Sequence, residues 1–280
     1  MLLEFRLWFA ESFINKIYIF QSQFLSFDFL KTDSGIEFQS GTLSLKIKMN
    51  NVQESEVIIL QAIAETLFDV VYLSLVISVG IRMILTGKDK KQYRLFGIMA
   101  VVLGCGDAFH LIPRAWALCT TGLDQYTAAL GAGKMITSIT MTVFYVILYY
   151  IWRIRYKIQG RKELTTAVYG LAAVRIFLCM MPQNQWLSAN APISWGIYRN
   201  IPFAFLGLLI IVLFYKSAKE HNDRDFRFMW LTIVLSFGFY IPVVLWADTI
   251  PLVGMLMIPK TCAYVWTVLI GYFAMKKEKK

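Results

Sequence analysis

The chain has 280 residues, of which 58% are hydrophobic, 15% are aromatic and only 16% are charged. A water-soluble domain of this length needs far more charge to cover its surface, so the composition predicts an integral membrane protein in contact with the lipid bilayer. The formal net charge of +10 does not indicate nucleic acid as a partner, because Lys and Arg lie in short clusters between apolar runs. Such clusters are typical of cytoplasmic loops.

Histidine and cysteine are too sparse to predict a metal centre. His110 and His221 are the only histidines in the sequence, which excludes a multi-histidine site. The four cysteines have neither a CxxC motif nor metal-ligand spacing; they are Cys105, Cys119, Cys179 and Cys262. We therefore expect no metal and no cofactor.

The first 48 residues differ from the rest of the chain. Residues 1–30 are apolar and aromatic but are interrupted by charges too often for a spanning helix, and residues 32–48 are polar. The segment also lacks the basic start and the cleavage site of a signal peptide. We expect residues 1–48 to be a dispensable or misannotated extension, with translation starting at Met49. The alternative is an amphipathic segment that lies on the membrane surface.

Seven apolar runs of membrane-spanning length follow this segment. Their approximate limits are residues 58–84, 93–115, 133–152, 164–181, 197–215, 226–247 and 251–275. The predicted fold is therefore an all-α integral membrane protein, with one seven-helix transmembrane domain over residues 49–280.

Basic residues are distributed unevenly between the loops. Residues 82–94, 153–162 and 216–227 each contain four or five Lys or Arg, as does the tail 276–280, whereas the loops of the other side contain almost none. The positive-inside rule then places the N-terminus outside and the C-terminus in the cytoplasm, and we expect the plasma membrane. The aromatic run 144–152 is predicted to form a belt at the inner interface, in contact with lipid.

Two parts of the chain resemble each other. Residues 72–79 align with residues 205–212, and further along Pro113 aligns with Pro242. The first three helices thus match the last three in the same orientation, with the fourth helix as an inverting linker. We therefore predict a parallel 3+1+3 repeat, which is one of the known plans of membrane transporters.

This 3+1+3 plan resembles that of the SWEET-type sugar transporters. The resemblance covers residues 57–276 at the level of architecture. It implies that Pro113 and Pro242 are hinges, and Pro259 is the third predicted hinge.

The helix number and orientation also resemble those of the microbial rhodopsins. That resemblance implies a retinal-linking lysine at Lys260 and a wall of the retinal site at residues 240–242 and Trp246. Two positions depart from the rhodopsin pattern: Leu256 stands one turn before Lys260 where that family has a carboxylate, and the run 133–152 contains no acid.

Ionisable residues gather in the half of the membrane that is predicted to face outward. Asp107, His110 and Arg114 are spaced by three and four, so one helix face carries all three. Charge at membrane depth is costly unless the groups face one another or a wet cavity. We therefore predict a ligand-binding pocket that is open to the outside and lined by Glu65, Asp69, Asp107, His110, Arg114, Arg175 and Lys260.

Three functions are considered for these ionisable residues. The first is the binding or transport of a small anionic or zwitterionic solute. The second is an intramembrane lipid-modifying enzyme with Asp107 and His110 as a general-base pair, and the third is a sensor with a Schiff base at Lys260. The repeat and the basic groups favour the first, so no residue is assigned a catalytic role; a homo-oligomer is compatible with it. Alternatively, Asp107–Lys260 and Asp69–Arg175 are ion pairs that join helices without a ligand.

Overall fold

The computed structural model describes residues 42–87, 90–247 and 249–278, and within these residues every regular element is a helix. Contacts divide the chain into two units, residues 1–57 and residues 58–280. Of the predicted N-terminal extension, residues 1–41 lie outside the described residues.

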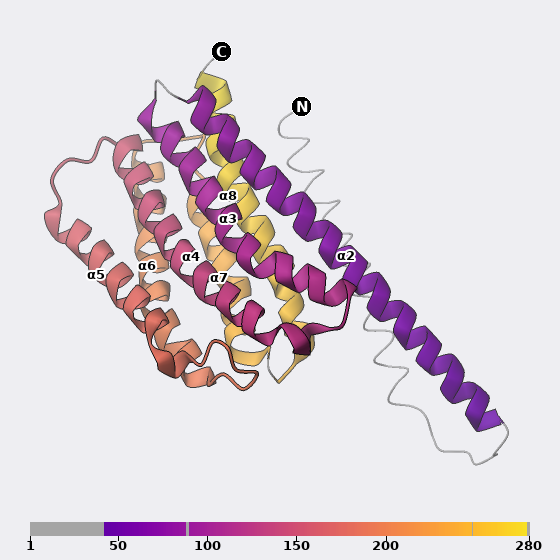
Figure 1. Ribbon diagram of the computed structural model, residues 1–280. Coiled ribbons are helices and arrows are strands. Elements are labelled where there is room, and N and C mark those ends of the chain that lie inside the picture. The colour runs from indigo at the N-terminus through magenta and orange to yellow at the C-terminus, as the bar shows by residue number, and fades with distance from the viewer. Residues whose placement is uncertain (1–41, 88–89, 248, 279–280) are drawn as a thin grey trace. The chain divides into compact units, whose positions relative to one another are not determined.

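Seven α-helices form the described part of the chain, and each is long and apolar enough to cross a membrane. They are α2 (Thr42–Thr86), α3 (Lys91–Cys119), α4 (Thr127–Arg155), α5 (Lys162–Met180), α6 (Ile193–Glu220), α7 (Met229–Trp246) and α8 (Met257–Glu278), as Figure 1 shows. Three short 3₁₀ helices accompany them: η1 (Leu123–Tyr126), η2 (Pro182–Asn184) and η3 (Pro251–Leu256). Over the described residues, the prediction of an all-helical fold with seven such helices is confirmed. The orientation and the parallel repeat stay predictions.

The last helix differs from the predicted one at its start. Residues 251–256 form η3, and α8 begins only after them. Pro259 therefore lies in the first turn of α8, where its missing N–H breaks no helical hydrogen bond. Lys260 lies in the same turn instead of the middle of the helix. Pro113 and Pro242 lie inside α3 and α7; a hinge role for the three prolines stays a prediction.

Glycines allow the closest approaches between neighbouring helices. Gly133 of α4 lies against the backbone of Phe109 and His110 in α3, and a Cβ at this position would overlap the carbonyl oxygen of Phe109. Gly80 of α2 and Gly97 of α3 face each other in the same way. Small residues at helix crossings let two backbones come together. These two crossings hold α2, α3 and α4 side by side.

The centre of the second unit is filled by aromatic side chains. Tyr145 and Trp152 of α4 are almost fully buried. The ring centroid of Tyr145 lies 5.0 Å from that of Phe203 in α6, in an edge-to-face arrangement, and Trp152 Nε1 donates to Ser217 Oγ at 3.0 Å. The prediction of a lipid-facing belt over residues 144–152 is therefore wrong for these side chains, because α6 covers the face that carries them.

Ion pairs join several helices at one end of the second unit. We call this the basic end; it comprises the loops between α2 and α3, between α4 and α5 and between α6 and α7, with the last turn of α8 (Figure 1). Arg155 of α4 donates to both carboxylate oxygens of Asp223, at 2.8 and 3.0 Å, and to Oε1 of Glu278 at 3.1 Å. Lys90 donates to the other oxygen of Glu278 at 2.6 Å. Four segments distant in sequence therefore meet at this end.

Candidate functional site

Two of the predicted residues form an ion pair between α2 and α3. The Arg114 guanidinium donates through Nε to Oε1 of Glu65 and through Nη2 to Oε2 at 3.3 Å. Such two-pronged contacts are stronger and more directional than single hydrogen bonds. The side chains are 33% and 20% exposed, so both partners are partly accessible.

A second contact between the same helices lies closer to the basic end. The Tyr72 hydroxyl donates to Oδ2 of Asp107 at 2.6 Å. Tyr72 is seven residues after Glu65, and Asp107 is seven residues before Arg114. Because seven residues are about two helical turns, both contacts lie on the same face of each helix.

Asp69 lies between these two contacts along α2. The side chain is buried, and its Oδ2 has no hydrogen-bond donor among the described residues. The charges with which it interacts are those of Glu65, Arg114 and Asp107. A buried carboxylate without hydrogen bonds is unfavourable. Asp69 therefore has an unused acceptor inside the bundle.

Lys260 reaches the same region from α8. Its Nζ lies 4.8 Å from the ring centroid of Tyr240 and 5.5 Å from that of Tyr264, which is within the range of cation–π attraction. The side chain is buried, and its charge interacts with those of Asp107 and Arg175. The described residues nevertheless contain no direct ion pair between Lys260 and Asp107.

Arg175 of α5 is almost fully buried in the aromatic centre. Its Cζ lies 3.2 Å from the ring centroid of Phe203, and neither Nε nor Nη1 has a hydrogen-bond acceptor in the described part of the chain. The groups that act on its charge are the hydroxyls of Tyr145, Tyr240 and Tyr264 and the thiol of Cys179, with no carboxylate among them. Arg175 therefore has unused donors.

These charges form a series across the bundle, which we call the polar row: Asp69, Asp107, Lys260 and Arg175. Each member interacts electrostatically with the next. The two inner members have opposite charges and partly compensate each other. The outer members are Asp69 and Arg175. Within the described residues they do not form the ion pair that was considered as an alternative to a ligand site, and neither has a hydrogen-bonded partner of opposite charge.

His110 has a different environment from Asp107. Its Nδ1 lies 3.2 Å from the carbonyl oxygen of Leu130, and its Cα packs on Gly133 of α4. Asp107 faces Tyr72 of α2 instead. The two side chains that would form a general-base pair are thus held by separate neighbours.

The sequence did not predict the part of the site formed by Tyr72, Tyr264 and Phe203, whereas Tyr240 belongs to the wall that the rhodopsin resemblance implies. Tyr72 donates to Asp107, and the rings of Tyr240, Tyr264 and Phe203 contact the two buried cations. The spacing of Tyr264, four residues after Lys260, is a signal that could have identified it. Phe203 has no such signal, because it reaches Arg175 from another helix.

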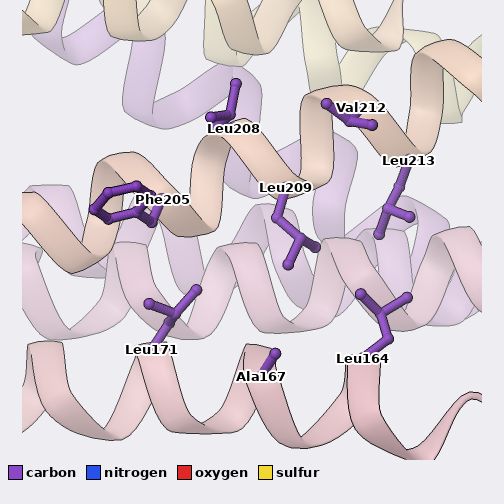
Figure 2. A pocket seen from close by; sticks show the side chains of 8 residues that line it. All are labelled: Leu164, Ala167, Leu171, Phe205, Leu208, Leu209, Val212 and Leu213. Atoms are coloured by element: carbon purple, nitrogen blue, oxygen red, sulfur yellow. The ribbon is translucent and has the colours of Figure 1, made fainter.

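An apolar groove lies between α5 and α6, and its volume is about 760 Å³. Figure 2 shows the side chains that line it: Leu164, Ala167, Leu171, Phe205, Leu208, Leu209, Val212 and Leu213. None of them carries a charge or a hydrogen-bonding group. The groove is therefore suited to apolar chains such as lipid tails. It is not suited to the charged groups that could pair with Asp69 or Arg175.

The polar row contains hydrogen-bonding groups without partners among the described residues. Its unused donors at Arg175 can meet an anion, and the unused acceptor at Asp69 can meet a positive charge. Within the described residues there is no group of three His, Cys, Asp or Glu that could hold a metal ion. Comparison of the chain with known protein families, with curated proteins and with solved structures gives no match.

Proposed function

We propose that the chain is a multi-pass membrane protein that binds or transports a small anionic or zwitterionic solute through the polar row. Seven helices of spanning length and apolar composition support insertion into a membrane. The basic end would then lie in the cytoplasm, because basic loops are retained on that side. In this orientation the polar row lies in the outer half of the bundle of a plasma-membrane protein.

The observation that carries the proposal is the environment of Arg175. A guanidinium with two unused nitrogen donors is buried against Phe203, and the charged side chain beside it is another cation, Lys260. An unpaired buried charge destabilises a folded protein by several kcal/mol. An anionic group of a solute would remove this cost and would be held by charge-assisted hydrogen bonds.

The orientation predicts opposite labelling of the two ends. In a variant whose four native cysteines are replaced by serine, Asp124→Cys is expected to react with a membrane-impermeant maleimide on intact cells. Asp124 is exposed in η1, whereas Lys157 is exposed in the loop between α4 and α5. Lys157→Cys is therefore the matched control, expected to react only after permeabilisation. The reverse pattern would place the polar row in the cytoplasmic half.

If a solute anion binds at Arg175, the substitution Arg175→Gln should weaken anion binding but raise the stability of the unliganded protein. Native mass spectrometry of the detergent-purified protein is expected to detect a bound small anion, with occupancy about 10-fold or more lower in Arg175→Gln, since hydrogen bonds to a charged group contribute about 1.5–3 kcal/mol. The unliganded Arg175→Gln protein should melt at a higher temperature than the unliganded parent, because an unpaired buried charge is removed.

Arg199→Gln is the matched control for this experiment. Arg199 of α6 shares Tyr240 and Cys179 as electrostatic neighbours with Arg175, but its guanidinium already donates to Oδ1 of Asn184 at 2.8 Å and lies over the Trp186 ring. We expect this variant to keep its bound anion. Equal occupancy in the parent and in Arg175→Gln would contradict the proposed function.

A further inference from the structure

We infer that Asp69 is a second subsite of the polar row, which binds one positive charge together with the anion held at Arg175. The inference rests on the proposed function and extends it. The positive charge can be an ammonium group of the solute or a separate monovalent cation, a proton or a sodium ion. The chemistry required at Asp69 is the same in each case.

The first argument is the isolation of the Asp69 carboxylate. The residue is only 6% exposed, and its Oδ2 has no donor among the described residues. Carboxylates at such positions are normally satisfied by several hydrogen bonds or by a cation. Asp69 accepts no hydrogen bond at Oδ2 in the described part of the chain, and the cation that acts on it, Arg114, is hydrogen-bonded to Glu65.

The second argument is that the neighbouring groups are already engaged. Nε and Nη2 of Arg114 donate to Glu65 and not to Asp69, and Tyr72 donates to Asp107. The titratable or charged groups that act on Asp69 are Glu65 on its own helix and Arg114 and Asp107 on α3. Arg114 compensates Glu65 and Lys260 compensates Asp107, so Asp69 has no counter-charge of its own and attracts a cation.

The third argument is the charge balance of the polar row. Asp107 and Lys260 compensate each other in the centre, so an anion at Arg175 alone would leave Asp69 as an uncompensated charge at membrane depth. Binding of a cation at Asp69 and of an anion at Arg175 balances both outer members. Each ligand therefore increases the affinity for the other, and linkage requires the two increases to be equal.

The test measures the thermal unfolding of the full chain in detergent against three sources of positive charge. The first arm replaces N-methylglucamine by Na⁺ at constant ionic strength, and the second lowers the pH. The third compares γ-aminobutyrate with butyrate, which lacks the ammonium group. We expect at least one arm to stabilise the parent, and the arm that does so identifies the source of the charge.

Asp69→Asn is expected to lose this response. The concentration of the effective cation at half-maximal stabilisation should rise about 10-fold or more, because a charge-assisted contact is removed. Asp69→Glu, which keeps the charge, should retain a response and shows that loss is not due to misfolding. Glu163→Gln, which changes an exposed carboxylate at the start of α5, is the control that should respond like the parent.

Two outcomes separate this inference from the proposed function. Identical responses of the parent and of Asp69→Asn in all three arms, or no response of the parent in any arm, would overturn the cation subsite while leaving the anion test at Arg175 as it stands. A response that depends on Asp69, together with unchanged anion occupancy in Arg175→Gln, would instead retain the cation subsite and reject the anion-binding function.

Discussion

Gly133→Ala is expected to destabilise the helix bundle by about 3 kcal/mol or more, at the upper end of the usual cost of overpacking. The added Cβ would overlap the Phe109 carbonyl oxygen and would come within 2.7 Å of His110 Cα. Both are backbone atoms, which cannot rotate away as a side chain does. Relief therefore requires α3 and α4 to separate, which would also break the contact between His110 of α3 and the Leu130 carbonyl oxygen of α4.

Gly170→Ala is the matched control for this substitution. A Cβ at Gly170, on α5, meets nothing within 4 Å. Alanine in a helix interior is about 0.5–1 kcal/mol more favourable than glycine, so this variant should be slightly stabilised. Unfolding of the detergent-purified proteins in a denaturant titration compares the two. Shifts of the same sign and size would show that the close crossing of α3 and α4 does not exist.

Arg155→Ala is expected to have the second large effect, a loss of about 3–5 kcal/mol. Its side chain is 18% exposed and that of Asp223 is 7% exposed, so removal of the guanidinium leaves a nearly buried carboxylate without its main partner. Glu278 loses a partner as well. Arg155→Lys keeps the charge but not the fork of donors and should recover only part of the stability. Recovery of full stability by lysine would show that the two-pronged contact is unimportant.

The same contact predicts how stability depends on pH. Burial acts to raise the pKa of Asp223, but the hydrogen bonds from Arg155 and from the backbone N–H groups of Phe226 and Asp225 outweigh it and lower the pKa below its usual value. A lowered pKa stabilises the fold above the unfolded value of about 3.9, and this stabilisation is lost as the pH falls through the folded pKa.

Asp223→Asn isolates this contribution. The difference in unfolding free energy between the parent and this variant should be constant near neutral pH and should shrink below about pH 4. Glu220→Gln, at the exposed end of α6, should show no such difference. A difference between the parent and Asp223→Asn that persists unchanged into strong acid would contradict the ionic nature of the contact.

The helical class and the number of long helices follow from local sequence. Each apolar run can satisfy its own backbone hydrogen bonds only as a helix when it lies in lipid, and the thickness of the bilayer sets its length. No partner helix has to be known for this prediction. The predicted start of the last helix is wrong, because residues 251–256 are apolar enough for an α-helix but form η3.

The partners of the polar residues depend on the tertiary structure. Asp107 and His110 are three residues apart on one face of α3, yet one faces Tyr72 of α2 and the other faces Leu130 of α4. Helical spacing gives only the approximate direction in which a side chain points. Two neighbouring helices can both lie in that direction, so the spacing does not tell which of them the side chain contacts. The choice between them is made by the glycine crossings, where backbone contact sets the rotation of each helix.

The sequence alone determined the seven apolar helices, and it predicted one layer of charged residues because hydropathy and residue order give each of them a depth along its own helix. The tertiary structure decided which of them meet. Arg175 lies over Phe203 and Lys260 lies beside Tyr240 and Tyr264, instead of forming direct ion pairs with Asp69 and Asp107. The physical reason is that depth is a property of one helix, whereas a contact depends on the relative rotation and position of two helices, which the packing of the whole bundle sets.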